Sequence, residues 1–234
     1  MIENRRKNIA VVLAGGTGQR AGFDIPKQFY LLRGRTILEH AVARFCALSC
    51  IDEVAIVSHR HHVAEVEKLV KKNGWTKVKA ILLGGKERYD SSLAAVRYYE
   101  GQEVNLLFHD SARPLVCAKA VKRLCEALQT HEAVAVGLPS SDTIWQTKEG
   151  CIVAIPDRQF LMRAQTPQAF RIGVIAEAYR RALNDPAFNV TDDCSVVLRY
   201  LPEMPLHIVE GAEQMMKLTY ASDIAILEQF LDAE

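Results

Sequence analysis

Short, continuous apolar runs alternate with segments whose apolar residues recur every three or four positions, up to about residue 138. Continuous runs are typical of strands that are buried on both faces, as in a parallel sheet. Spacing of three and four is typical of amphipathic helices. The predicted strands are Ile9–Leu13, Glu53–Val57, Val78–Leu83, Asn105–His109 and Ala133–Leu138. The predicted helices are Thr36–Leu48, His62–Lys72, Glu87–Tyr99 and Ala118–Thr130. Such alternation predicts an α/β fold with a mostly parallel sheet flanked by helices.

The alternation stops at about Pro139. The following polar stretch predicts two short extended segments around a turn at Lys148–Gly150. A two-stranded hairpin is marginally stable alone, so we expect this arm, at about residues 139–160, to pack on a second subunit and make a homodimer. The remaining predicted elements are a helix at Gly173–Asn184, short strands at Leu206–Val209 and Met216–Leu218, and a closing helix at Ser222–Leu231.

Composition narrows the class of protein. With 234 residues and 49% hydrophobic content, the chain can form one domain over residues 1–234 with a full core. A net charge of +1 gives no electrostatic reason to expect nucleic acid or an acidic membrane surface as a partner. No apolar run is long enough to span a membrane, and the polar start, MIENRRKN, does not resemble a signal peptide. Six cysteines without a CxxC pair favour reduced thiols and a cytoplasmic location.

A glycine-rich loop follows the first predicted strand. It contains Gly15, Gly16, Gly18 and Arg20, and a Pro-Lys pair ending at Lys27 comes soon after. Glycines directly after a strand let backbone N–H groups approach phosphates closely. Two cations within one loop suit a polyphosphate. These residues predict a loop that binds a nucleoside triphosphate.

Three other interpretations of this region need weighing. The spacing Gly16-x-Gly18-x-x-Ala21 also matches the dinucleotide-binding fingerprint of an NAD-dependent oxidoreductase. That fingerprint needs a helix opening inside the motif and an acidic residue after the second strand, and this chain offers neither. A Walker-type loop is absent from the sequence, and an ordinary surface turn stays possible. Further along, the histidines of the segment SHRHH can form a metal patch, although a solvated helix start fits them better.

Polar clusters also follow the later strands, where an α/β sheet places its ligands. Gly85 and Ser91 open a helix, Asp110 and Ser111 end a strand, and Arg158, Thr191 and Lys217 stand in other polar or edge positions. Each cluster also has a plain structural explanation, such as helix capping, an edge-strand lysine, or pairing of Asp110 with Arg113. Together they predict a basic rim of Arg20, Lys27, Arg158 and Lys217, with Asp110 as the main acid. The sequence shows no Ser-His-Asp signature and no paired carboxylates with acid–base spacing. Phosphoryl or nucleotidyl transfer needs mainly positioning and cations.

The motifs AGGTGQR…PKQF, GGKERYDS, HDSARP, DR…AQTPQAF, TDD and VEG…MKLT occur in the order found in one known family. The chain resembles the cytidylyltransferases of isoprenoid precursor biosynthesis and their relatives that act on ribitol 5-phosphate. The resemblance spans about Ile9 to Phe230. It implies a Rossmann-like fold with a protruding β-arm. It also implies transfer of CMP from CTP to an alditol phosphate, most closely 2-C-methyl-D-erythritol 4-phosphate, with Mg²⁺ bound mainly through the CTP phosphates rather than by metal-ligating side chains.

The resemblance also implies roles for single residues. Residues that would bind CTP are Ala14, Gly15, Gly16, Gly18, Gly85, Ser91, Asp110 and Ser111. Arg20 and Lys27 would stabilise the α-phosphate during transfer, and Arg158 and Lys217 would position the acceptor phosphate. Thr143, Thr166 and Thr191 would help bind that phosphate. Because the arm reaches the partner in this family, Thr143 and Arg158 would serve the neighbour's site.

The motifs mix features of the two branches of the family. The Gly-Gly pair at Gly15 and Gly16 is commoner in relatives that use other alditol phosphates, and Met215-Met216 replaces an Asn-Ile pair before Lys217. In contrast, Ala112-Arg113-Pro114, the AQTPQAF run and Thr191-Asp192-Asp193 resemble the methylerythritol branch. Methylerythritol phosphate is the favoured acceptor, and ribitol 5-phosphate is the alternative. A non-catalytic nucleotide-binding protein and an NAD-dependent oxidoreductase are the other hypotheses.

Overall fold

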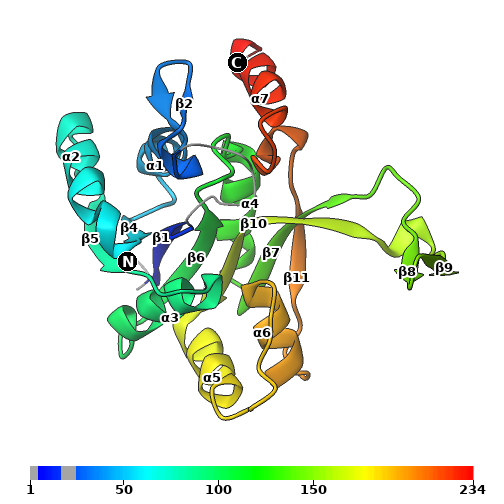
Figure 1. The fold of residues 1–234 in the computed structure, drawn as a ribbon. Coiled ribbons are helices and arrows are strands. Elements are labelled where there is room, and N and C mark those ends of the chain that lie inside the picture. Colours follow the sequence, from blue (N-terminus) through cyan, green and yellow to red (C-terminus); the bar gives the residue numbers. More distant parts are fainter. Residues whose placement is uncertain (1–4, 17–24, 234) are drawn as a thin grey trace.

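A seven-stranded sheet runs through the centre of the protein (Figure 1). The computed structural model describes residues 5–16 and 25–233, so the predicted site residues Gly18 and Arg20 lie outside the described residues. The strand order is β11-β7-β10-β6-β1-β4-β5, and only β10 runs antiparallel to its neighbours. The strands are β1 (Lys7–Ala14), β4 (Glu53–Ser58), β5 (Val78–Leu83), β6 (Val104–Asp110), β7 (Ala133–Pro139), β10 (Met162–Arg171) and β11 (His207–Glu210). The mostly parallel sheet confirms the predicted fold class.

Helices cover both faces of this sheet. The helices are α1 (Ile37–Ala47), α2 (Val63–Asn73), α3 (Arg88–Tyr99), α4 (Ala118–Ala127), α5 (Ile172–Ala182), α6 (Asp193–Tyr200) and α7 (Asp223–Asp232). Along β1, Ile9, Val11 and Leu13 pack with α3, α5 and α6. The intervening residues of β1, such as Val12, pack with α1, α2 and α4. The alternation of side chains along a strand therefore builds two separate cores.

A third, smaller core fixes the C-terminal helix. Leu227 of α7 packs with Leu218 and Leu115, and with Leu32 of the short hairpin β2 (Leu31–Leu32) and β3 (Arg35–Thr36). Leu218 is fully buried there. This packing holds the segment that carries Lys217 against the body of the protein.

Most predicted elements are confirmed, with ends shifted by a few residues. One prediction is wrong, because Met216–Leu218 is not a strand. A short 3-10 helix, Glu213–Met215, precedes it, and the Leu218 N–H donates to the Ala112 carbonyl at 2.8 Å. Burial of apolar side chains, and not sheet pairing, explains its hydrophobic pattern. Strand β10 and helix α6 were not predicted.

The predicted arm is present as a two-stranded hairpin, β8 (Gln146–Lys148) and β9 (Cys151–Ala154). Its turn uses Glu149 and Gly150 at φ +52° and +80°, as a tight two-residue hairpin turn requires. The arm projects from the body of the molecule (Figure 1). Large apolar side chains on it are exposed, namely Ile144, Trp145, Ile152, Val153, Ile155 and Phe160. The described chain leaves this apolar surface uncovered, and its predicted role in dimerisation stays a prediction.

A capping box starts α1. The Thr36 hydroxyl accepts from the Glu39 N–H, and the Glu39 carboxylate accepts from the Thr36 N–H at 2.8 Å. Glu39 is 2% exposed and also accepts from Asn73 and Lys72 of α2 at 2.9 and 3.1 Å. Burial by itself would raise the pKa of Glu39, but the hydrogen bonds from Asn73, Thr36 and Lys72 lower it to about 2.

We expect Glu39→Gln to reduce the free energy of unfolding by about 2 kcal/mol near pH 7, because charge-assisted hydrogen bonds are lost. A carboxylate with a lowered pKa stabilises the fold above its unfolded pKa, and this stabilisation is lost as pH falls. The difference in the free energy of unfolding between wild type and Glu39→Gln should therefore narrow as pH falls from 4.5 towards 2. Urea unfolding measures it, with Glu65→Gln on exposed α2 surface as the control. An equal difference at all pH values would contradict the role of the charge.

Candidate active site

Asp110, the last residue of β6, lies between two basic side chains, Lys217 and Arg88, and the three form a charged cluster. Its Oδ2 accepts from Lys217 Nζ at 2.8 Å, and its Oδ1 accepts from Arg88 Nε at 2.9 Å. The Asp110 side chain is only 12% exposed. Burial would raise the pKa of Asp110, but the charges of Arg88 and Lys217 hold it well below its usual range. The suggested pairing with Arg113 is absent, since Arg113 donates to the carbonyls of Met215 and Ala164.

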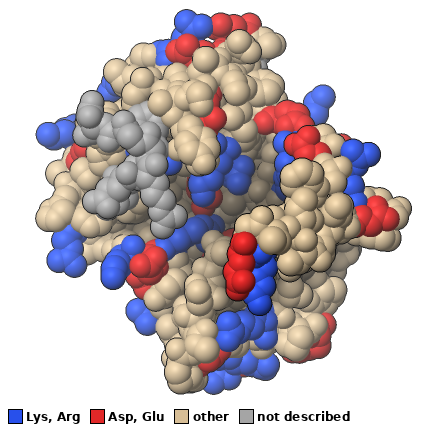
Figure 2. All heavy atoms as spheres, turned by 45° about the vertical axis from the view of Figure 1, so that its right-hand side comes forward, with Lys and Arg blue, Asp and Glu red and all other residues tan. Residues whose placement is uncertain are grey.

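The carboxyl ends of β1, β4 and β6 meet beside this cluster. Leu13 of β1 lies opposite Asp110, and the Ser111 N–H donates to the Leu13 carbonyl at 3.0 Å. Ala14, the next residue, ends β1 opposite Ser58 of β4. Figure 2 shows a depression near the middle of one face, where basic and acidic side chains lie next to each other. The predicted ligand edge of the sheet therefore carries Ala14, Asp110 and Ser111 together.

Lys27 lies next to the segment that carries Lys217. It stands in the short 3-10 helix Lys27–Phe29, and its Nζ donates to the carbonyls of Leu218 and Thr219 at 3.4 and 3.3 Å. Its neighbour Gln28 donates to the Ala14 carbonyl at 3.1 Å, which ties this helix to the end of β1. Two predicted cations, 190 positions apart in the sequence, are thus brought to one place.

Three glycines surround Ser91 and the start of α3. A Cβ added to Gly15 would lie 2.9 Å from the Ser91 Oγ, and one added to Gly84 would lie 2.5 Å from it. A Cβ on Gly85 would lie 2.5 Å from the Cβ of Asp90. Real Cβ atoms do not approach other atoms so closely. The loops after β1 and β5 therefore pack against the buried Ser91 hydroxyl only because they lack side chains, while Gly16 faces open space within the described chain.

A chain of hydrogen bonds runs behind Asp110. The Asp110 N–H donates to Thr166 Oγ1 at 3.2 Å, and Thr166 Oγ1 lies 3.0 Å from His109 Nδ1. His109 Nε2 lies 2.9 Å from the Arg113 carbonyl. Since a carbonyl only accepts, His109 donates from Nε2, and its Nδ1 accepts from Thr166. Burial of this fully enclosed ring lowers the pKa of His109 to about 4. Thr166 was predicted to help bind the acceptor phosphate, but its side chain is buried and belongs to this chain of hydrogen bonds.

The start of α6 places Thr191. Asp192 is the N-cap residue, and its side chain accepts from the Ser195 N–H at 2.9 Å. The Thr191 hydroxyl, one residue earlier, lies 3.2 Å from the Ser195 hydroxyl. Gln168 of β10 joins this turn to the sheet by donating to Asp192 and accepting from the Cys194 N–H. The helix cap is therefore Asp192, and not Thr191.

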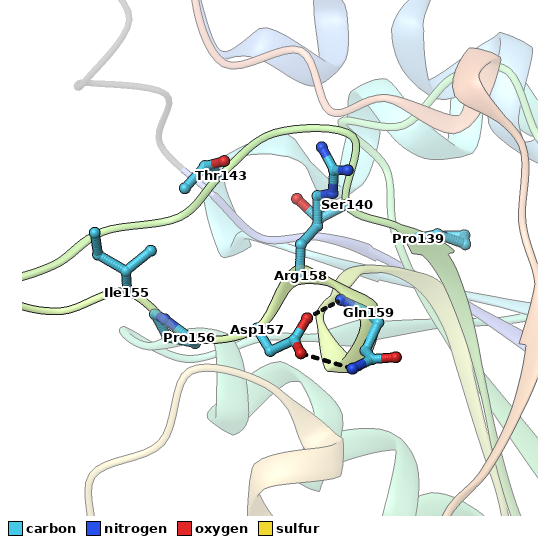
Figure 3. A pocket seen from close by; sticks show the side chains of 8 residues that line it. All are labelled: Pro139, Ser140, Thr143, Ile155, Pro156, Asp157, Arg158 and Gln159. Atoms are coloured by element: carbon cyan, nitrogen blue, oxygen red, sulfur yellow. Dashed lines mark hydrogen bonds between the residues drawn. The ribbon is translucent and has the colours of Figure 1, made fainter.

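Thr143 and Arg158 lie together at the base of the arm, in a hollow of about 650 Å³ (Figure 3). Arg158 Nη1 donates to the Ser141 carbonyl at 2.9 Å, and Asp157 accepts from the backbone and side chain of Gln159. Within residues 5–16 and 25–233, no hydrogen bond or ion pair joins Thr143 or Arg158 to Asp110 or Lys217. The predicted acceptor residues therefore form two groups, one on the arm and one on the body.

Arg88 and Asp193 lie in the motifs GGKERYDS and TDD, but neither was predicted to be a site residue. Arg88 Nη1 donates to Asp193 Oδ2 at 2.7 Å, and the Tyr179 hydroxyl donates to Asp193 Oδ1 at 2.8 Å. Asp193 is fully buried. An aspartate on the apolar side of a short helix needs a cation or donors, and this was the one signal that pointed to a hidden partner.

The described part of the site holds cations, hydroxyls and one central carboxylate. Among residues 5–16 and 25–233, no cluster of three or more His, Cys, Asp and Glu side chains is arranged to hold a metal ion. His59 and its neighbours instead form a short 3-10 helix, Arg60–His62, that leads into α2. No helix in the described ranges is long and apolar enough to cross a membrane. The cations and hydroxyls of the site suit phosphoryl or nucleotidyl transfer, which is catalysed mainly by positioning and positive charge.

Comparisons with known proteins agree with this chemistry. The family model described as IspD, 2-C-methyl-D-erythritol 4-phosphate cytidylyltransferase, matches residues 8–233. A protein of that name from Thermobifida fusca is 47% identical, over 97% of this chain and 95% of the relative. A bifunctional ribulose 5-phosphate reductase/CDP-ribitol pyrophosphorylase, Bcs1 from Haemophilus influenzae, is 38% identical, over 98% of this chain but only 49% of that protein.

Solved structures show the same fold. The crystal structure of 4-diphosphocytidyl-2C-methyl-D-erythritol synthase from Anaerococcus prevotii superimposes with a TM-score of 0.84 at 23% identity, covering 98% of this chain and all of that one. At that identity the likeness concerns the fold alone. It includes the central mixed sheet and its covering helices, as predicted from the alternating pattern.

Proposed function

Because this chain belongs to the IspD family of 2-C-methyl-D-erythritol 4-phosphate cytidylyltransferases, we propose that it transfers CMP from CTP to 2-C-methyl-D-erythritol 4-phosphate. The products are the CDP-alditol and pyrophosphate, a step in isoprenoid precursor biosynthesis. The observation that carries the proposal is the match of the family model to residues 8–233, together with 47% identity to a relative of that name over nearly the whole chain.

In this proposal, CTP binds along the carboxyl edge of the sheet. Ala14, Gly15, Gly16 and Gly18 wrap the triphosphate with backbone N–H groups, and Gly85 and Ser91 lie near the base. Tight packing of Gly15 and Gly84 on the Ser91 hydroxyl supports this, because a side chain at either glycine would displace the loop. Asp110 and Ser111 lie near the ribose and the phosphates.

The acceptor supplies its own nucleophile. A phosphate monoester with a second pKa near 6 is largely a dianion at neutral pH, so it needs no general base. One of its oxygens attacks the α-phosphorus of CTP in line, a new P–O bond forms, and the bond to pyrophosphate breaks. Negative charge develops on the α-phosphoryl oxygens, where Arg20 and Lys27 stabilise it. Arg158 and Lys217 position the acceptor phosphate, assisted by Thr143, Thr166 and Thr191.

Mg²⁺ is the proposed cofactor. The described residues offer Asp110 as one carboxylate at the proposed triphosphate site and no set of three ligands. Such a site fits an ion held mainly by phosphate oxygens, since Mg²⁺ binds through one or two carboxylates plus substrate phosphates. When bound, the ion neutralises charge on the triphosphate and on the leaving pyrophosphate.

The arm is proposed to complete the site of a neighbouring subunit in a homodimer. Its exposed apolar side chains, such as Trp145 and Phe160, support packing on a partner. The body of the chain carries Lys27 and Lys217, and the arm carries Thr143 and Arg158 in a separate hollow. A second copy of the chain can therefore supply the arm residues to the site of the first.

Complementation tests this arrangement. We expect Arg158→Ala and Lys27→Ala to be nearly inactive alone. After mixing and subunit exchange, about half of the dimers are mixed, and each has one site that carries both intact residues. About a quarter of the wild-type activity should therefore return, since mixed dimers arise by mass action. The control is a mixture in which both substitutions are on the same chain and the other chain carries Lys217→Ala. Activity that stays at the level of the single variants would contradict the shared site.

Pyrophosphate release with CTP and Mg²⁺ tests the function. The assay runs 2-C-methyl-D-erythritol 4-phosphate and ribitol 5-phosphate in parallel. Fast turnover with the first supports the proposal. Turnover only with ribitol 5-phosphate would instead support the alternative, for which the 38% identity to the Haemophilus influenzae CDP-ribitol pyrophosphorylase is the weaker support. No pyrophosphate with either acceptor, despite CTP binding, would contradict both.

A further inference from the structure

We propose that Arg88 is a positioning residue, which holds the Asp110 carboxylate in place when Lys217 leaves it for the acceptor phosphate. The inference rests on the proposed function, because that function gives Lys217 a phosphate to bind. In the structure, Lys217 and Arg88 each contact one oxygen of Asp110. The Lys217 ammonium shares its charge and donors between all its partners, so its hold on Asp110 weakens when it turns to a phosphate. A second, lasting partner then keeps the Asp110 carboxylate in place.

The two cations differ in how firmly they are held. The Lys217 side chain is 44% exposed, and its only ion pair within the described residues is with Asp110. The Arg88 side chain is 25% exposed and pairs with both Asp110 and Asp193. A flexible, exposed lysine loses little when it changes partner, whereas Arg88 would leave a buried carboxylate unpaired. Lys217 is therefore the partner that leaves, and Arg88 is the one that stays.

Asp193 anchors Arg88 from behind. Its Oδ2 accepts from Arg88, its Oδ1 accepts from the Tyr179 hydroxyl of α5, and it is fully buried in α6. Arg88 uses two different nitrogens, Nε towards Asp110 and Nη1 towards Asp193. The planar, rigid fork of a guanidinium is well suited to hold two acids in fixed positions in this way. The carboxylate of Asp110 is thus tied through Arg88 to two helices of the rigid core.

The third nitrogen of Arg88 supports this account. Nη2 is buried and has no hydrogen-bond partner among the described residues. An unpaired buried donor is unfavourable. The two carboxylates therefore fix the position of the guanidinium, although Nη2 is left without a hydrogen bond there.

The first test compares CTP binding with turnover. Arg88→Gln alone leaves Asp193 buried and unpaired and can fail to fold, so the main variant is Arg88→Gln with Asp193→Asn, which removes both charges of the pair. Lys217 stays on Asp110 until the acceptor binds. The Kd for CTP, titrated without acceptor, is therefore expected to stay within about threefold of wild type. Turnover with both substrates should fall at least about tenfold, since small displacements of a positioned group reduce rates strongly.

The matched control is Arg171→Gln with Glu132→Gln. This pair lies 2.6 Å apart, and Arg171 is 23% exposed, close to the value for Arg88. Arg171 ends β10 away from the carboxyl edge of β6, so its loss should leave turnover unchanged. Equal loss of CTP affinity and turnover in the Arg88 variant would show a general structural defect and overturn the inference, as would turnover within threefold of wild type.

A second measurement needs no activity at all. In Lys217→Met, Arg88 still holds Asp110, so urea unfolding should change little. Combining Lys217→Met with the Arg88–Asp193 variant removes both partners of Asp110, and the loss should exceed the sum of the separate losses. Additive losses would overturn the inference. If the wild type itself releases no pyrophosphate, the proposed function fails, while this stability comparison still decides whether Arg88 is the lasting partner of Asp110.

Discussion

Replacing Lys27 with alanine is expected to lower turnover by about a hundredfold to a thousandfold and to leave the fold intact. Loss of one preorganised donor to developing negative charge has an effect of this size. Its Nζ donates to the backbone carbonyls of Leu218 and Thr219 over long distances of 3.4 and 3.3 Å, and loss of these two contacts should change the free energy of unfolding little. The loss should therefore fall on kcat more than on the KM for CTP, because the charge it stabilises exists mainly in the transition state.

Lys77 provides a matched control. Its Nζ also donates to two backbone carbonyls, those of Leu48 and Ile51 at 2.7 and 2.8 Å. It precedes β5 and so lies at the amino end of the sheet, opposite the candidate site. Lys77→Ala should keep full turnover. If both variants lose the same activity, or if Lys27→Ala raises only the KM for CTP, Lys27 does not stabilise the transferred phosphoryl group.

The free energy of unfolding is expected to fall by about 3 kcal/mol between pH 7 and pH 4 because His109 stays neutral in the folded protein. The pKa of this histidine is lowered from 6.5 to about 4, because burial disfavours the charged ring. In the unfolded chain the ring takes up a proton below pH 6.5, and in the folded protein it does not. The stabilisation is thus complete above pH 6.5 and is lost as pH falls to about 4.

His109→Gln isolates this contribution. Glutamine can still accept from Thr166 and donate to the Arg113 carbonyl, but it does not titrate. Urea unfolding at fixed protein concentration should show wild type losing about 3 kcal/mol more than the variant between pH 7 and pH 4. Burial also lowers the pKa of His40, and that contribution cancels in the comparison. Parallel pH curves for the two proteins would show that His109 is protonated without cost in the fold.

The architecture could be predicted because most strands and helices follow simple patterns. Buried strands such as β1 are continuous apolar runs, and α1 starts at a Thr-x-x-Glu capping box. Strand β10 was missed because it contains Pro167 and polar residues, which normally argue against a central strand. Its polar side chains are buried and bonded to other elements, for example Thr166 to Asp110 at the end of β6 and Gln168 to Asp192 at the start of α6. One sequence contains no sign of such long-range partners.

Several residues of the candidate site could be predicted from the sequence, but most contacts between them could not. Ala14, Asp110 and Ser111 lie together, as expected for carboxyl ends of neighbouring parallel strands. Lys217 was placed on an edge strand, although it lies on an irregular segment packed by Leu218. Arg88 lies between Gly85 and Ser91 in the motif GGKERYDS, and only those two residues were given a predicted role. Which side of α3 faces the site depends on packing with α5 and α6, and a pattern within one helix does not contain that information.

The arm is not an appendage joined by a flexible linker. It leaves at the end of β7 and returns at the start of β10, and these two strands pair side by side in the central sheet, with Leu138 opposite Arg163 and Gly137 opposite Ala164. The arm, with its own two-stranded sheet, is therefore the far end of the connection between two paired strands of the central sheet. We therefore expect a force on the tip of the arm to act first on the ends of β7 and β10, and β10 carries Thr166, which accepts from the Asp110 N–H.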